Sequence, residues 1–273
     1  MTLERIRYEA CPLCGCEAIT DLLAFDCSKH PLYKPQLPAE IQWCECFECK
    51  HVFTDGYFDA EALEVLFSTA HEYQQPGHEP DRGRMQWARV VERVTAILRG
   101  GGGFAAAPRD ETISRWLDVG FGDGTLLFTA QEWGYEPLGV DLRRASVEKL
   151  IALGVPARCG AFETIDEPGS CAVVSLADVL EHMPFPKPAL AHVRKLLAAD
   201  GLLFVSMPNM DTGSWRVLDR DRRNPYWMEL EHYHNFSRRR LYALLAEAGL
   251  VPVWYGVSHR YACGMEVIAR RTA

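Results

Sequence analysis

The sequence has no long hydrophobic run. Nowhere do about 18 apolar residues follow one another, which is the length that a membrane-spanning helix needs. The first residues, MTLERIRYEACPLC, carry charges where a signal peptide requires an apolar core. Internal repeats and low-complexity tracts are also absent. We therefore expect a soluble, cytoplasmic protein with no membrane partner.

The sequence also has relatively few basic residues. The 37 acidic residues outnumber the 29 basic ones, and the formal net charge is −8 at pH 7. Such a chain has no general attraction for phosphate backbones, so RNA and DNA are disfavoured as partners and a small molecule is favoured. With 273 residues and 48% hydrophobic content, the chain can form a sizeable core, and we expect one main domain beside a smaller one.

Cysteine, in contrast, is plentiful, because the chain contains ten. Without a secretion signal, this number indicates metal binding rather than disulfide bonds. Two C-x2-C pairs, CPLC and CFEC, could together give four thiolates to one tetrahedral zinc ion. The predicted zinc ligands are Cys11, Cys14, Cys46 and Cys49.

Two alternatives remain for this ligand set. Cys16 or Cys44 lies close enough in sequence to replace one ligand, Cys27 sits between the pairs, and the thiols could also be reduced and free of metal. Four thiolates leave no open position for water or substrate, and so short a segment has too little core to fold unaided. We therefore expect the zinc to be structural.

The chain divides into three segments. Residues 1–57 are the expected zinc-binding module, and residues 58–112 a helical linker, with helices over 59–68 and 82–99 and a glycine-rich connector from Gly100. From residue 113 to 273, strands and helices alternate, which implies a parallel sheet covered on both faces. The apolar runs 251–257 and 265–269 are expected to close this sheet as a hairpin.

A strand, a glycine loop and a helix follow one another in residues 117–130, LDVGFGDGTLLFTA. Glycines at such a junction let the backbone approach a ligand, and the helix offers unpaired N–H groups. The spacing is G-x-G-x-G, whereas dehydrogenases use G-x-G-x-x-G. Asp141 ends the next apolar run and could accept both hydroxyls of a ribose, so the pattern predicts a nucleoside-like ligand; a tight turn beside a solvated aspartate is the alternative.

The G-x-G-x-G loop resembles motif I of the class I S-adenosylmethionine (SAM) methyltransferases. Residues 173–184, VVSLADVLEHMP, extend the likeness, and residues 116–209 resemble methyltransferases of the ubiquinone-biosynthesis O-methyltransferase type. The resemblance implies an α/β, Rossmann-like, doubly wound and mostly parallel seven-stranded sheet with an antiparallel C-terminal hairpin, and SAM as cofactor. It places the cofactor on Asp118, Gly120, Gly122, Gly124, Asp141, Leu142, Gly160, Ala161, Phe162 and Ala177.

Methyl transfer to oxygen or carbon also requires removal of a proton. His182 is the first candidate base, because it follows the fourth strand; its alternative role is to buttress the site together with Glu181. Residues 211–237 form a long insertion, which we expect to act as a substrate lid. Within it, Glu231 and His232 could be a base with its orienting carboxylate; a capping and packing segment is the alternative.

Paired CxxC motifs joined to a SAM domain with LEH and a later Glu-His pair resemble the bacterial deoxysugar C-methyltransferases. The resemblance implies that His182, Glu231 and His232 act on the acceptor and that the zinc module contributes a tyrosine, here Tyr73. Glu229 stands where those enzymes are expected to have a tyrosine, and their further C-terminal domain has no counterpart after the hairpin. The predicted acceptor is therefore a small polar molecule of specialised metabolism. The residues expected to line its binding site are Tyr73, Asn209, Trp215, Trp227 and His234.

Three other functions compete with this interpretation. An RNA-modifying methyltransferase would use the zinc module to bind RNA, but residues 40–61 are acidic rather than basic. A nicotinamide oxidoreductase would require the other glycine spacing. A non-catalytic SAM-binding protein would keep the glycine loop without needing His182.

Overall fold

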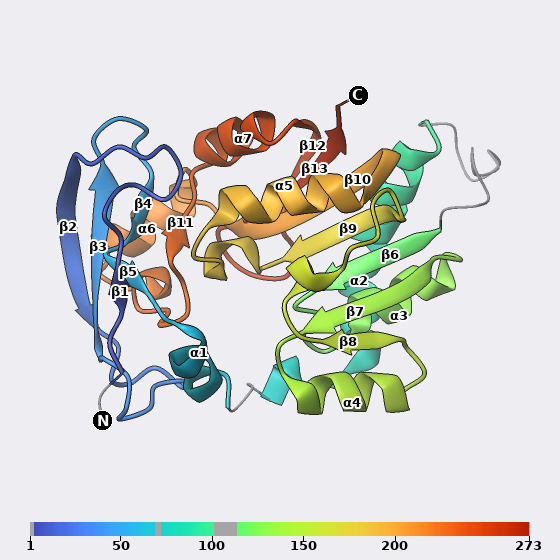
Figure 1. Ribbon diagram of the computed structural model, residues 1–273, viewed down its shortest axis with the longest axis horizontal. Helices are drawn as coiled ribbons and strands as arrows, with labels where there is room; N and C mark the ends of the chain where they lie inside the picture. Colours follow the sequence, from blue (N-terminus) through green and yellow to red (C-terminus); the bar gives the residue numbers. More distant parts are fainter. Residues whose placement is uncertain (1–2, 69–71, 101–113, 273) are drawn as a thin grey trace.

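The computed structural model describes residues 3–68, 72–100 and 114–272 (Figure 1). The residues after Gly100 in the expected connector, and the expected domain start at residue 113, lie outside these ranges. Among the described helices, none is long and apolar enough to cross a membrane.

A seven-stranded sheet forms the main domain, with strand order β12-β13-β10-β9-β6-β7-β8. The pairs from β10 to β8 are all parallel, whereas β13 runs antiparallel to both β10 and β12. This confirms the expected Rossmann-like sheet and its C-terminal hairpin. The strands are β6 (Arg115–Val119), β7 (Glu136–Asp141), β8 (Ala157–Cys159), β9 (Cys171–Ala177), β10 (Leu197–Pro208), β12 (Leu250–Val257) and β13 (Gly264–Arg271).

Helices cover both faces of this sheet, because successive strand residues point to opposite sides. Leu117 and Val174 pack on one face with α5 (Pro186–Leu196) and α7 (Arg238–Glu247). Trp116 and Val173 face the other layer, which is formed by three helices. These are α2 (Pro80–Leu98), α3 (Thr125–Glu132) and α4 (Arg144–Ala152).

Helix α2 lies within the expected linker, yet it packs into the main domain. Its buried residues Val90, Val91 and Val94 belong to the same apolar cluster as α3 and the sheet. Gly83 allows the close approach, since a Cβ at this position would lie 2.4 Å from the Thr125 hydroxyl oxygen. This packing favours a main domain that begins near Pro80.

The N-terminal module shares a second sheet with the main domain. Strands β2 (Ile19–Asp26), β3 (Glu40–Cys46) and β4 (Val52–Thr54) form an antiparallel sheet whose fourth strand is β11 (His234–Asn235), which comes from the insertion after β10. Figure 1 shows β11 reaching into the blue module. The remaining module elements are β1 (Ile6–Arg7), β5 (Gly56–Tyr57), α1 (Ala60–Leu66) and the 3-10 turn η1 (Glu72–Gln74).

The insertion after β10 therefore serves as a platform for the module. It contains α6 (Gly213–Arg220) and the turn η4 (Pro225–Trp227) before β11. Trp215 and Trp227 share an apolar cluster with Trp43 of the module, and the Trp43 indole N–H donates to the Trp227 carbonyl oxygen at 2.9 Å. These contacts differ from those of a mobile lid.

The two other 3-10 turns that the structure describes are η2 (Phe162–Thr164) and η3 (Leu180–His182).

Candidate functional site

The glycine loop follows β6 and leads into α3. Gly120, Gly122 and Gly124 have φ angles of 64°, 54° and 76°, a left-handed conformation that glycine adopts without strain. A Cβ at Gly120 would lie 2.8 Å from Val179, and one at Gly124 would lie 2.7 Å from Leu150. At Gly122, nothing described lies within 4 Å of that position. The loop is thus packed at its two ends and open to a ligand at its middle.

Asp118 lies at the end of β6, directly before this loop. Its side chain is buried and accepts a hydrogen bond of 2.6 Å from the Ser175 hydroxyl. Burial, reinforced by the negative charge of Asp123, raises the pKa of Asp118 to about 7 although the Ser175 bond acts in the opposite direction. Burial therefore favours the protonated, uncharged form of Asp118.

Asp141 ends β7, where the sequence predicts contact with a ribose. Its two carboxylate oxygens accept from the Arg143 guanidinium, with Nε at 2.9 Å and Nη2 at 2.7 Å, and the Arg143 backbone N–H donates at 2.8 Å. A carboxylate has about four lone-pair sites, so ribose hydroxyls could share these oxygens with Arg143. The cofactor would have to bind against this ion pair.

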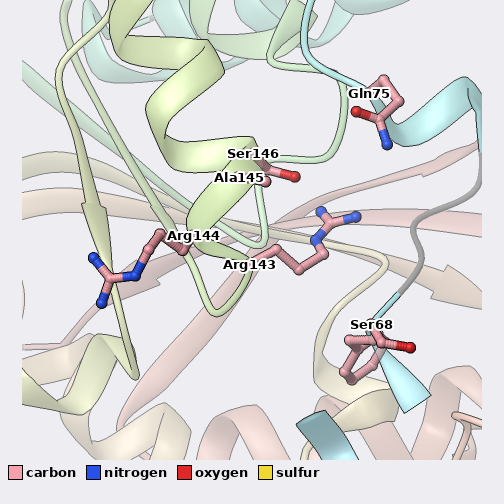
Figure 2. Close-up of a pocket in the computed structure, with 7 residues that line it drawn as sticks. Ser68, Gln75, Arg143, Arg144, Ala145 and Ser146 are labelled. Carbon is pink, nitrogen blue, oxygen red and sulfur yellow. The ribbon is translucent and has the colours of Figure 1, made fainter. Parts of the chain in front are cut away.

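A cavity of about 260 Å³ opens beside Arg143 (Figure 2). Figure 2 shows the Arg143 side chain extending toward Gln75 and Ser68, while Arg144 points to the other side. Gln75 and Ser68 follow the N-terminal module, so residues preceding the main domain cover the predicted ribose edge. The cavity is lined by Phe67, Ser68, Gln75, Arg143, Arg144, Ala145 and Ser146.

The other predicted cofactor residues lie at the ends of neighbouring strands. Leu142 is 55% exposed directly after Asp141, so its side chain is available to a flat ligand. Gly160 has φ 134° and open space at its Cβ position, and Ala161 beside it is exposed. Phe162, in contrast, is buried against the His192 ring, so its side chain belongs to the core. Ala177 is the half-buried last residue of β9.

The three predicted catalytic residues come together near the carboxyl end of β9. The His182 and His232 rings are perpendicular with centroids 4.6 Å apart, and His182 Nδ1 lies 3.1 Å from the Glu231 carbonyl oxygen. Burial, together with the positive charge that neighbouring His182 could carry, lowers the pKa of His232 well below its usual value. His182 is half-buried and His232 is buried.

Charged residues outside the predicted catalytic set also lie near this trio. His30 Nε2 lies 3.0 Å from a Glu229 carboxylate oxygen and 3.5 Å from one of Glu231. Burial opposes protonation of His30, but these two carboxylates raise its pKa. Glu181 is 1% exposed, and burial raises its pKa well above the usual range. His30 comes from the module, and no sequence pattern connects it with residues near position 230.

Tyr73, the predicted acceptor tyrosine, lies on η1 near the same carboxylates. Its side chain is 60% exposed. Burial of the rest of the residue and the negative charges of Glu231 and Glu229 raise the pKa of its phenol. The structure thus brings Tyr73 into electrostatic range of the Glu231 side chain.

Asn209, Trp215, Trp227 and His234 are all buried, which differs from the exposed position expected of acceptor-lining residues. Trp215 and Trp227 pack in the core beneath the module, because the insertion pairs with that module. The Asn209 side-chain oxygen accepts from the Asp211 backbone N–H at 2.9 Å.

His234 is held within the interface between the module and the main domain. Its Nε2 lies 2.9 Å from the Met183 carbonyl oxygen, and its Nδ1 lies 3.0 Å from His51 Nε2. Burial lowers the pKa of His234 to about 4. His234 therefore joins the segment after β9 to the module rather than facing an acceptor.

A second charge cluster, also not selected from the sequence, closes the site toward the C-terminal hairpin. Asp178 accepts hydrogen bonds from Arg260, Tyr261 and the Ser206 hydroxyl. Burial acts to raise the pKa of Asp178, but the Arg260 guanidinium holds it below its usual value. Arg260 also stacks on the Trp87 ring at 4.2 Å. Arg260 is thus already paired with a carboxylate.

The four cysteines of the CxxC pairs converge at one point of the module. The sulfur atoms of Cys11 and Cys49 lie 3.7 Å apart, those of Cys14 and Cys46 lie 3.5 Å apart, and all four lie within 4.8 Å of one another. A tetrahedral site with Zn–S bonds of about 2.3 Å requires sulfur separations of about 3.8 Å. The geometry therefore fits a four-thiolate zinc site.

The other cysteines of the module are directed elsewhere. The Cys16 sulfur lies 3.8 Å from the Ala18 carbonyl oxygen, and the Cys44 sulfur lies 3.5 Å from Asp21. Neither joins the cluster of four. The alternatives in which Cys16 or Cys44 replaces a ligand are thus disfavoured by position.

Comparison with known proteins identifies the class. Residues 84–254 match the methyltransferase domain family, and the chain belongs to that family. Its main domain is a class I SAM-dependent methyltransferase domain, with the strand order and glycine loop described above.

A curated relative is the ubiquinone biosynthesis O-methyltransferase of Idiomarina loihiensis, 37% identical over 107 residues. The match covers 36% of this chain and 44% of the relative, so the chain spans less than half of that protein's length.

Solved structures show the same fold at low sequence identity. The 1,6-didemethyltoxoflavin-N1-methyltransferase of Burkholderia thailandensis, with its acceptor and S-adenosylhomocysteine (SAH) bound, is 19% identical with a TM-score of 0.52; the match covers 84% of this chain and 99% of that chain. The magnesium protoporphyrin IX methyltransferase of Synechocystis PCC 6803, with bound SAH, is 17% identical with a TM-score of 0.53, over 71% of this chain and 88% of that one. At these identities the likeness concerns the fold.

Proposed function

We propose that this protein transfers the methyl group of SAM to a small polar molecule of specialised metabolism. The observation that carries the proposal is the meeting of His182, His232 and Glu231 at the carboxyl end of β9, the edge of the sheet where the glycine loop also lies. The names of the similar O- and N-methyltransferases, which refer to small-molecule metabolism, support a small acceptor. The net charge of −8 argues against a nucleic acid.

The residues fit a cofactor with a nucleoside part. SAM supplies a methyl group on a positively charged sulfur, which an aligned nucleophile can accept. Gly122 leaves room for close approach to the loop, and Asp141 offers oxygens to the ribose. Leu142 presents an exposed apolar side chain next to it, suited to the adenine.

On the acceptor side, His182 is the group best placed to take a proton. Its Nδ1 can donate to the Glu231 carbonyl oxygen, which leaves the lone pair of Nε2 free to accept. His232 packs at right angles to it, and the Glu231 carboxylate lies beside His30. The module thereby contributes a charged residue to the acceptor side of the site.

We also propose that the four cysteines of the module hold a structural zinc. The sulfur separations support a tetrahedral ion, and four thiolates would leave no open position for catalysis. An ion at this place would join the loop before β2, which carries Cys11 and Cys14, to the turn between β3 and β4, which begins at Cys46.

The test of the function is calorimetric titration of the purified protein with SAM, SAH and NADH in parallel. We expect micromolar binding of SAM and SAH and no binding of NADH. Asp200→Asn, an exposed carboxylate outside the site, serves as the control variant and should bind like the wild type. Binding of NADH alone would overturn the proposal. Protein with confirmed SAH affinity is then screened against small polar metabolites by detection of SAH release.

A further inference from the structure

We propose that Glu181, His182 and His232 form a binding site for a divalent cation on the acceptor side of the methyl-transfer site. This site is separate from the four cysteines, which form a ligand group of their own. Its role in the reaction rests on the proposed function, but the binding of the cation does not.

The three residues offer a compact set of ligand atoms. One atom from each, a carboxylate oxygen and two imidazole nitrogens, lies within 4.8 Å of the other two. Glu181 and His182 are consecutive in the turn η3, and His232 meets His182 at right angles. Two histidines and one carboxylate on one side of an ion are a recurrent ligand set for divalent transition metals, and they leave positions open.

Buried polar atoms without partners point to the same place. Both carboxylate oxygens of Glu181 are buried and have no hydrogen-bond partner among the described residues, and the same holds for His232 Nδ1. Burying an unpaired carboxylate is costly, so such a group usually faces a cation. The Arg260 guanidinium, whose charge acts on Glu181, is already paired with Asp178. A bound cation would satisfy the Glu181 carboxylate.

A hydrogen bond to the backbone also orients His182 as a metal ligand. A metal-bound histidine usually donates its second ring N–H to a carbonyl or carboxylate, which fixes the ring and directs the other nitrogen to the metal. His182 Nδ1 lies 3.1 Å from the Glu231 carbonyl oxygen, so its Nε2 can be the ligand atom. The carboxylates of Glu231 and Glu229 lie nearby and add negative charge, and both approach the His30 imidazole.

Nitrogen and oxygen ligands suit Mn²⁺, Fe²⁺, Co²⁺ or Zn²⁺ better than Ca²⁺. The open positions would accept oxygen atoms of the acceptor. The corresponding acceptor class is a small molecule that can chelate, with a hydroxyl next to a second hydroxyl or a carbonyl. A cation there would lower the pKa of such a hydroxyl. Because the ion would use the Nε2 lone pair of His182, the proton of that hydroxyl would pass instead to a nearby carboxylate such as Glu231, whose charge acts on Glu181 and whose Oε2 lies 3.5 Å from His30 Nε2.

The experiment is titration with Mn²⁺ of protein that carries one zinc per chain by metal analysis, so that only the four-cysteine site is filled, followed by electron paramagnetic resonance of the free ion. The test variants are Glu181→Gln and His182→Gln, and the matched control is His192→Gln, a half-buried histidine on α5 that is not part of the cluster. We expect one Mn²⁺ per chain, with affinity roughly tenfold or more weaker in both test variants and unchanged in the control. Thermal unfolding of each variant shows that it is folded.

Two outcomes would overturn the site: no Mn²⁺ binding up to about 1 mM, the weak end of biological divalent-cation sites, or binding that Glu181→Gln and His182→Gln leave unchanged. SAH titration of the same samples separates the two proposals. If Mn²⁺ does not bind while SAH does, only the cation site fails. If SAH does not bind while Mn²⁺ does, the proposed function fails and the cation site stands.

Discussion

Replacing Asp118 by Asn should change how the stability of the protein depends on pH. Asp118 is fully buried, and its pKa is about 7 in the folded chain against 3.8 for an ordinary aspartate. A carboxyl group with a raised pKa stabilises the fold while it is protonated. Its contribution is fully present below about pH 4 and is lost as the pH rises through 7.

The size of this effect follows from the difference between the two pKa values. A difference of about 3 corresponds to about 4 kcal/mol between the acid and alkaline limits. Between pH 5 and pH 8, the wild type should lose about 3 kcal/mol of unfolding free energy relative to Asp118→Asn. The amide has nearly the same shape, and its oxygen can still accept from the Ser175 hydroxyl.

Urea denaturation of the two proteins at pH 5, 6, 7 and 8 measures this difference. All other titrating groups are shared, so they cancel when the two free energies are subtracted at each pH. Asp200→Asn, at an exposed position, is the control and should give a difference that does not vary with pH. A constant difference for Asp118→Asn as well would show that Asp118 stays charged throughout, and the argument from burial would be refuted.

Three further changes test the cofactor site, the cysteine cluster and the interface. Asp141→Ala removes a charged acceptor of two ribose hydroxyls, each worth about 1.5–3 kcal/mol, so calorimetry should show SAH binding at least about 100-fold weaker; unchanged affinity would exclude the ribose contact. Cys14→Ser should lower the zinc content and the thermal midpoint together, and a full zinc content by metal analysis would contradict the four-thiolate site. Trp43→Ala should cost about 3–5 kcal/mol in urea unfolding, because the ring is fully buried against Trp227; a loss below about 1 kcal/mol would show that this interface contributes little.

Short-range patterns in the sequence are sufficient to predict the main sheet. The φ angles of Gly120 and Gly122 are ones that glycine adopts readily, so the loop is visible as G-x-G-x-G. Strands buried on both faces are visible as apolar runs such as Val173 and Val174. The C-x2-C pairs are equally local, because each brings two thiolates together within one turn of the chain. Each of these features depends on residues close in sequence.

The contacts of the insertion could not be predicted in this way. Trp215 and Trp227 are large and aromatic, which suits a lid and a core equally well. Their partner Trp43 lies 184 residues from Trp227, and His30 lies 199 residues from Glu229. A single sequence contains no signal that pairs such distant residues. Helix α2 has the spacing of any amphipathic helix, which does not reveal the surface that its apolar side covers.

These long-range contacts make the acceptor side of the site depend on the N-terminal module. Strand β4 of the module pairs with β11, so that His234 lies opposite Phe53. His232 precedes His234 by two residues in the chain. His234 also contacts the Met183 carbonyl oxygen, directly after His182. Through His234, the shared sheet is therefore connected to the chain next to His182 and to the chain next to His232. A zinc that orders the loops beside β3 and β4 would stabilise this arrangement without touching the acceptor, so the module can be needed for activity although its metal is not catalytic.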